Sequence, residues 1–262
     1  MRIYTVDSFT DRVFRGNPAG VCLLDGSMPD AWMQSVAAEM RHSETAFVRA
    51  GERNGPYSLR WFTPATEVAL CGHATLATAH VLYSTGTAPQ TLEFSTKSGI
   101  LSVTRDADGL LTMDFPAKTV TEATPPEGLI EALGAESVRI HRNEWDYLIE
   151  LEDEGAVRSA SPDFTALAAV DARGVIVTAE SAGDEADYVS RFFAPRVGVP
   201  EDPVTGSAHC ALAPYWSARL GRDALVGRQL SERGGEIHTT VRGDRVDLTG
   251  RAVTVLSGEL HA

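Results

Sequence analysis

The sequence contains few cysteines, few basic residues and no long apolar run. Its three cysteines, Cys22, Cys71 and Cys210, are an odd number without CxxC spacing, which argues against a disulfide framework and a structural zinc site. Lys and Arg total 23 against 36 Asp and Glu, giving a formal net charge of −13, which disfavours nucleic acid and anionic membranes as partners. No apolar run approaches the ~18 residues of a membrane span, and the chain opens without the apolar stretch of a secretion signal. We therefore expect a soluble, cytoplasmic protein.

The pattern of apolar residues predicts a mixed, α+β fold. Alternating or apolar runs predict strands, while helical spacing predicts helices over residues 29–40 and 206–219. Residues 72–83 are small or apolar almost all round, which is typical of a buried helix. The main strands are expected near 2–7, 19–24, 44–49, 57–62, 91–95, 98–105, 110–115, 136–142, 145–151, 173–179, 187–194, 236–242, 244–249 and 251–260.

An internal repeat relates the two halves of the chain. Residues 60–64 (RWFTP) match 191–195 (RFFAP). After a loop, residues 71–74 (CGHA) match 205–208 (TGSA), and each of these two segments opens a helix of small residues. Shared residue types at matching places favour a duplication, although two chance strand–loop–helix units would look similar.

The repeat predicts two lobes of similar topology. We place the N-terminal lobe at residues 1–117, completed by the last strand at about 251–262, and the C-terminal lobe at 118–250. The stretch 116–126, with two adjacent prolines, is the expected hinge.

The two matching loops predict a site for a small anion. Gly72 and Gly206 each stand at a helix start, where backbone N–H groups lack intrahelical partners and the helix dipole is positive. Such ends bind carboxylates without a lysine, so Ser207 and both glycines are candidates for substrate binding. The alternative is that each glycine only permits close helix packing.

Three titratable residues near these loops are candidates for catalysis. Asp202 lies between two prolines just before the second helix, although a turn or cap would also use an aspartate there. His73 occupies an expected exposed helix start, where a ligand contact or proton carrier competes with a satisfied core histidine. Glu44 heads an apolar strand; a carboxyl in an apolar cleft has a raised pKa and can act as acid and base. A surface glutamate or structural acceptor is the alternative for Glu44.

Four pieces of the sequence together carry a family resemblance: residues 7–9 with 16–21 (DSF, GNPAGV), 42–47 (HSETAF), 60–64 with 72–75 (RWFTP, GHAT) and 201–209 (EDPVTGSAH). At these motifs the chain resembles the PhzF-like family of phenazine-biosynthesis isomerases, which have a diaminopimelate-epimerase-like fold. The resemblance implies two pseudo-symmetric lobes, each a curved, mostly antiparallel sheet around a central helix, with the site in the cleft between them.

The resemblance also implies an activity and a set of site residues. It implies a homodimeric isomerase that needs no cofactor or metal and acts on a small anionic substrate, trans-2,3-dihydro-3-hydroxyanthranilate in the phenazine enzyme. Glu44 would be the general acid/base, assisted by His73 and Asp202, while Gly72, Gly206 and Ser207 would line the anion site. A shared fold does not transfer the substrate.

One position limits the chemistry. Epimerases and racemases of this fold use two cysteines, one at each helix start, whereas this chain has Cys71 and Thr205. A threonine hydroxyl is too weak an acid to replace a thiol, so two-base racemisation is disfavoured. A Cys71-dependent lyase or epimerase and a non-catalytic small-anion binding protein remain as alternatives, and the absence of a GxSxG motif argues against a serine hydrolase.

Overall fold

The computed structural model describes residues 1–52, 55–86 and 89–261. The chain divides into two compact units, the first formed by residues 1–114 with 249–262 and the second by residues 115–248. No helix among the described residues is long and apolar enough to cross a membrane.

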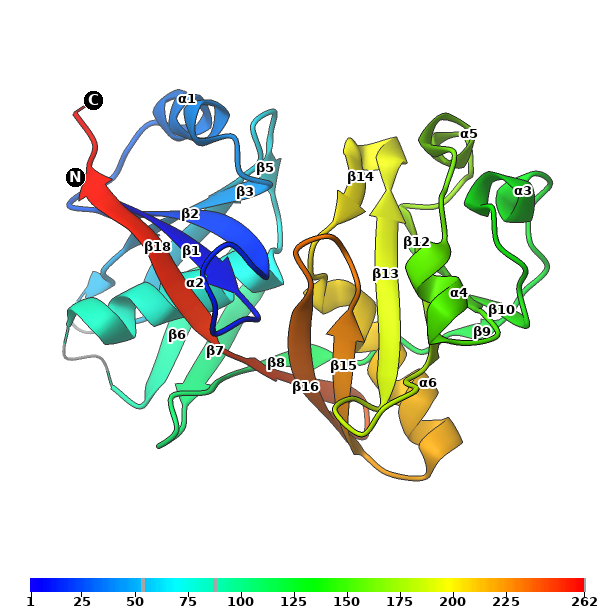
Figure 1. The fold of residues 1–262 in the computed structure, drawn as a ribbon. Coiled ribbons are helices and arrows are strands. Elements are labelled where there is room, and N and C mark those ends of the chain that lie inside the picture. Colours follow the sequence, from blue (N-terminus) through cyan, green and yellow to red (C-terminus); the bar gives the residue numbers. More distant parts are fainter. Residues whose placement is uncertain (53–54, 87–88, 262) are drawn as a thin grey trace. The chain divides into compact units, whose positions relative to one another are not determined.

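Figure 1 shows the elements of both units, whose bounds follow the chain order. The first unit contains β1 (Arg2–Ser8), β2 (Asn17–Leu24), α1 (Asp30–Met40), β3 (Glu44–Arg49), β4 (Tyr57–Phe62), β5 (Glu67–Val68), α2 (Gly72–Thr85), β6 (Thr91–Thr96), β7 (Gly99–Arg105) and β18 (Ala252–Glu259), and β8 (Leu111–Pro116) leads out of it. The second contains β9 (Thr121–Glu122), α3 (Leu129–Leu133), β10 (Arg139–Arg142), β11 (Asp146–Glu150), α4 (Glu154–Ser159), α5 (Phe164–Ala168), β12 (Gly174–Glu180), β13 (Tyr188–Ala194), the 3₁₀ turn η2 (Pro195–Val197), β14 (Val199–Asp202), α6 (Gly206–Leu220), β15 (Ala224–Gln229) and β16 (Gly235–Arg242), and β17 (Arg245–Gly250) leads out of it.

The strands of the two units pair in the same order. In the first unit β1–β2 is antiparallel, β2–β3 parallel, β3–β4 antiparallel, β4–β6 parallel and β6–β7 antiparallel. In the second unit β10–β11, β11–β12, β12–β13, β13–β15 and β15–β16 repeat that series of directions. The resulting mixed sheets with helices make the protein α+β, as the sequence predicts.

Helices cover the sheet of the first unit from two sides (Figure 1). Alternate strand residues such as Ile3, Cys22 and Phe47 form one buried cluster with the apolar face of α1. Helix α2 contacts β1, β2, β3 and β18, and its buried residues lie all round its circumference. A helix buried on every side needs small side chains to fit, which explains the repeated Ala and Thr residues between Ala74 and Ala79.

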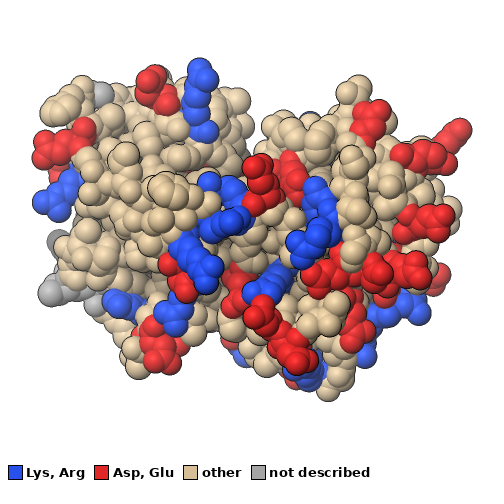
Figure 2. Space-filling model, viewed as in Figure 1, with Lys and Arg blue, Asp and Glu red and all other residues tan. Residues whose placement is uncertain are grey.

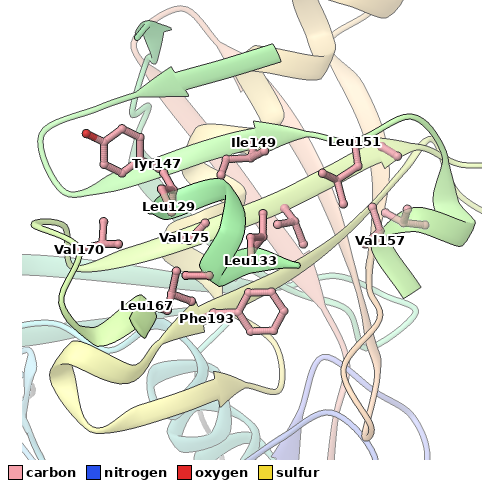
Figure 3. Close-up of a cluster of buried hydrophobic side chains, with 14 residues drawn as sticks. Leu129, Leu133, Tyr147, Ile149, Leu151, Val157, Leu167, Val170, Val175 and Phe193 are labelled. Carbon is pink, nitrogen blue, oxygen red and sulfur yellow. The ribbon is translucent and has the colours of Figure 1, made fainter. Parts of the chain in front are cut away.

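The second unit uses the same alternation. Tyr147 and Ile149 of β11 point into a cluster that α3, α4 and α5 cover, as Figure 3 shows. Leu148, between them in the sequence, packs instead with Ile176 and with residues of α6. Because successive strand residues face opposite sides of a sheet, one strand serves both cores.

Several elements of the second unit differ from the sequence prediction. The segment 199–202, part of the predicted loop before the second helix, forms strand β14. The short strand β9 inside the expected hinge, the turn η2, helix α4 and strand β15 were not predicted. Helix α4 spans six residues, begins at the Asp153 cap and includes a glycine, so its periodicity is too short to detect. Strand β15 carries Gly227, where a Cβ would lie 2.5 Å from the Tyr188 ring, so a residue of low strand propensity is required there.

Charges of both signs alternate on the surface. On the face drawn in Figure 2, Lys and Arg side chains lie beside Asp and Glu side chains instead of forming one basic field. Several arginines of the second unit are paired, including Arg228 with Glu185 and Arg242 with Asp247.

Candidate functional site

Glu44, Cys71 and His73 form a compact polar cluster in the first unit. Glu44 is the first residue of β3, Cys71 immediately precedes α2, and His73 is the second residue of that helix. The Glu44 Oε2 atom lies 3.4 Å from His73 Nε2, and Cys71 Sγ lies 3.5 Å from His73 Nδ1. The Ser43 hydroxyl lies 3.2 Å from His73 Nε2. The carboxyl group, the thiol and the imidazole therefore contact one another in one cluster, with the ligand atoms of all three within 4.8 Å.

The fold holds this cluster through the backbone. Ser8, at the end of β1, donates a 2.7 Å hydrogen bond from its buried hydroxyl to the His73 carbonyl. Strand β3 pairs in parallel with β2, so that Glu44 stands opposite Ala19. Inside α2 the Thr75 hydroxyl donates to the Cys71 carbonyl at 2.6 Å, which satisfies a polar group in the first buried turn. The positions of all three site residues thus depend on buried contacts.

Burial dominates the electrostatics of the cluster. The Glu44 side chain is 19% exposed, and burial raises the pKa of its carboxyl, while hydrogen bonds with Ser43 and Cys71 oppose that rise. A carboxyl with a raised pKa can both release and accept a proton near neutral pH. The expectation that His73 occupies an exposed helix start is wrong, because the residue is 7% exposed. The small residues that bury α2 on all sides also bury its first turn.

Asp202, Thr205 and Gln229 form a second polar group, in the second unit. The Thr205 hydroxyl donates to the Asp202 carboxylate, and the Thr205 backbone N–H donates to Gln229 Oε1 at 2.8 Å. The Gln229 amide in turn donates to the Asp202 carbonyl at 2.7 Å. Gly206 and Ser207 follow directly as the first residues of α6. The side chain of Gln229 therefore fixes the turn that carries Asp202 to the helix start.

Sequence reasoning missed Gln229 and Ser43 as parts of these groups. Gln229 ends β15, a strand that the sequence did not predict, so nothing placed it beside Thr205. Ser43 lies within the HSETAF motif next to Glu44, and that proximity was the available signal.

Matching arginine–glutamate pairs hold the two loops before the helices. Arg60 on β4 binds Glu67 on β5 through Nε and Nη2, at 2.7 and 2.8 Å. Arg191 on β13 binds Glu201 on β14 in the same way, at 2.7 and 2.9 Å. Each glutamate precedes its helix-start residue, Cys71 or Thr205, by the same spacing in the sequence. The repeat therefore includes a bidentate ion pair, of which the sequence motif contained the arginine but not the glutamate.

The position of Glu44 has no carboxylate counterpart in the second unit. Thr45 pairs with Phe62 and Val175 pairs with Phe193, which makes Gly174 the equivalent of Glu44. A Cβ at Gly174 would lie 2.4 Å from the Phe192 ring. A phenylalanine ring therefore occupies the space that a side chain would need there.

The candidate residues are distributed over both units. The first unit brings together Glu44, Gly72 and His73, and the second brings together Asp202, Gly206 and Ser207. Glu44, Cys71 and His73 also offer one potential metal-ligand atom each, all within 4.8 Å of one another. None of the three cysteines forms a disulfide in the described chain.

The whole chain matches a known family. The model of the phenazine biosynthesis-like protein family matches residues 6–258. The chain belongs to this family. An uncharacterized isomerase of Halalkalibacterium halodurans is 49% identical over 261 residues, covering 98% of this chain and 97% of that protein. The resemblance inferred from the sequence motifs is therefore confirmed.

Solved structures agree with the family assignment. The crystal structure of a PhzF-family phenazine biosynthesis protein from Enterococcus faecalis is similar with a TM-score of 0.95 and 42% identity, covering 100% of this chain and 99% of that one. A hydroxyproline epimerase from Agrobacterium vitis has a TM-score of 0.62 at 12% identity, covering 99% and 90% of the two chains. That second likeness extends to the fold alone, which is thus epimerase-like.

Proposed function

We propose that this protein is an isomerase that shifts a proton within a small carboxylate-bearing metabolite, with Glu44 as its general acid/base and without a cofactor. The observation that carries the proposal is the buried Glu44 carboxyl, whose pKa is raised by burial, beside the His73 imidazole at 3.4 Å. A carboxyl in that state can accept a proton from one carbon of a bound substrate and return it to another.

The divergence of the two halves supports a single acid/base. A racemase needs a proton carrier on each face of the substrate carbon, yet Gly174 replaces Glu44 and Thr205 replaces Cys71 in the second unit. The Thr205 hydroxyl already donates to Asp202 and is a very weak acid. A shift in which one group removes and returns the proton requires only the groups of the first unit.

The remaining residues have proposed roles in binding and orientation. His73 would orient Glu44 and exchange protons with it, and Asp202 would assist from the second unit. Gly72, Gly206 and Ser207 would bind the substrate carboxylate through the backbone N–H groups at the starts of α2 and α6. The family resemblance implies that the substrate would bind in a cleft between the two units, and our proposal includes that cleft and a homodimeric, cytoplasmic enzyme.

Replacing Glu44 with glutamine tests the assignment. The amide keeps the size of the carboxyl but cannot transfer a proton, so turnover should fall about 10²–10⁴-fold, the usual contribution of a positioned acid/base. The assay measures deuterium incorporation from D₂O into a panel of small unsaturated carboxylic acids, including trans-2,3-dihydro-3-hydroxyanthranilate. Glu93→Gln, an exposed substitution on β6, is the matched control and should retain full exchange.

A second candidate is a lyase or epimerase that uses Cys71 as its base. The Cys71 Sγ atom lies 3.5 Å from His73 Nδ1, close enough for the imidazole to assist a thiolate. Cys71→Ser should lower deuterium exchange far less than Glu44→Gln if Glu44 is the base. The reverse order would favour the thiol enzyme, and tight binding of a panel acid without any exchange would favour a non-catalytic binding protein.

A further inference from the structure

A groove in the second unit lies away from the candidate site. It has a volume of about 780 Å³ and is bounded by β9, β10 and the C-terminal half of α6. Pockets of this size commonly hold small organic ligands. Gly206 opens α6, whereas Tyr215 lines the groove nine residues later, about 14 Å along the helix.

A proline inside α6 explains how the groove is built. Pro214 has no backbone N–H, so the carbonyl of Cys210, four residues earlier, loses its usual helical donor. That carbonyl instead accepts a 2.9 Å hydrogen bond from the Lys118 backbone N–H. The bond attaches the segment after β8 to the helix and places Val120 in the wall of the groove. The apolar lining consists of Val120, Ala123, Val138, Ile140, Pro214 and Ala218.

A cationic cluster lies at one side of this apolar lining. Glu150, which is 7% exposed, accepts hydrogen bonds from Tyr215 at 2.6 Å, Arg219 at 2.8 Å and Arg139 at 3.1 Å. One buried carboxylate thus faces two guanidinium groups, which leaves one positive charge in excess within the cluster. Both arginines line the groove, and Arg139 is half exposed. Glu122, at the rim, is the one acidic residue in the lining.

The His141 imidazole also lies in the lining. Its Nδ1 atom is buried without a hydrogen-bond partner among the described residues, so a ligand in the groove does not reach that nitrogen, and the ring packs edge-on against Tyr215 at 5.0 Å. Burial lowers the pKa of His141, which favours the neutral ring. The imidazole therefore adds a flat, uncharged wall to the groove.

We infer that this groove binds a small organic anion with an apolar body. The anionic group would contact Arg139 and Arg219, and the apolar body would pack against Val120 and Pro214. The site is independent of the proposed proton shift. Its residues lie around the C-terminal half of α6, whereas Gly206 and Ser207 lie at the N-terminus of that helix.

The test uses the fluorescent aromatic sulfonate 8-anilinonaphthalene-1-sulfonate as its probe on the full-length protein. Arg139→Gln should raise the Kd of the probe about tenfold, the loss expected for one charge-assisted contact. Ala218→Trp, on the exposed side of α6, should abolish binding by filling the groove without changing its charge. Arg242→Gln, which removes an exposed arginine outside the groove, and Glu44→Gln should leave the Kd unchanged.

Two further measurements locate the ligand and define its charge. Benzoate should displace the probe whereas neutral benzamide should not, and the probe should shift the NMR resonances of the His141 ring, which lines the groove. Equal Kd values in the wild type, Arg139→Gln and Ala218→Trp would overturn the inference. Loss of probe binding in Glu44→Gln but not in the groove variants would assign the probe to the candidate site, and this result would also overturn the inference.

Discussion

The ion pair of Glu67 makes a quantitative prediction about stability. Glu67 receives two hydrogen bonds from Arg60 and one from Lys97, which together lower the pKa of its carboxyl from 4.5 to about 2. Glu67→Gln keeps the shape of the side chain and removes its charge. We expect the variant to be less stable at pH 7, because the ionised carboxylate is the form that the folded protein favours.

The expected loss follows from the pKa difference. A carboxyl whose pKa falls from 4.5 to about 2 on folding contributes at most about 3.4 kcal/mol to the free energy of unfolding, at pH values above its ordinary pKa. The Lys97 side chain is 58% exposed and Arg60 is 27% exposed, so solvent screening reduces this figure, and we expect about 2 kcal/mol. The contribution is present in full above about pH 5 and disappears as the pH falls through about 2. There Glu67 is protonated and neutral, like the glutamine of the variant.

Urea unfolding of the wild type and Glu67→Gln at several pH values between 2 and 7 tests this reasoning. The difference in unfolding free energy should shrink steadily below pH 5, even though many other carboxyls titrate, because those are common to both proteins. Glu93→Gln controls for the loss of an exposed carboxylate. A difference that stays constant with pH, or that is absent at pH 7, would refute the assigned role of the ion pair.

Two further substitutions test the other central observations. Gly174→Ala should destabilise the second unit by about 1–3 kcal/mol, measured by thermal unfolding, since its Cβ would lie 2.4 Å from the Phe192 ring. An unchanged Tm would show that the ring moves aside easily. Glu44→Gln should be more stable than the wild type at pH 8 and equal to it at pH 3, because the raised pKa of Glu44 means that ionisation is disfavoured in the folded state. A wild type more stable than the variant at pH 8 would contradict the burial argument.

The sequence predicts the α+β class and most strands, because strands are marked locally by alternating apolar and polar residues or by short apolar runs. The helix at residues 72–83 was recognised from small residues on all sides, and the structure extends it to Thr85. Helix α4 was not predicted because it has only six residues and contains Gly155. Strand β15 was not predicted because it contains Gly227, which the neighbouring Tyr188 ring requires. Gln229 consequently escaped as well, although it holds the Asp202 turn.

The environment of the candidate site could not be predicted from the sequence. The motifs propose Glu44 and His73 as site residues, but the exposure of a side chain depends on packing that no local pattern records, and His73 is buried. Likewise, the repeat aligned Arg60 with Arg191, but their bidentate bonds to Glu67 and Glu201 required the strand pairings of β4 with β5 and β13 with β14.

The two halves keep a common frame and differ where chemistry is proposed. Trp61 pairs with Val68 and Phe192 pairs with Asp202, so the second unit has a carboxylate where the first has a valine. Conversely, Glu44 in the first unit corresponds to Gly174 in the second. Each half therefore supplies one carboxyl group, and the two come from different elements. A two-base exchange would instead use proton-transferring groups at matching positions of the two halves. The ion pairs that fix both loops are present in both units, whereas the groups proposed for chemistry differ at the head of β3, at the helix starts and at the end of β14. That distribution supports one proton-transferring carboxyl, Glu44, with Asp202 held in place by Thr205 and Gln229.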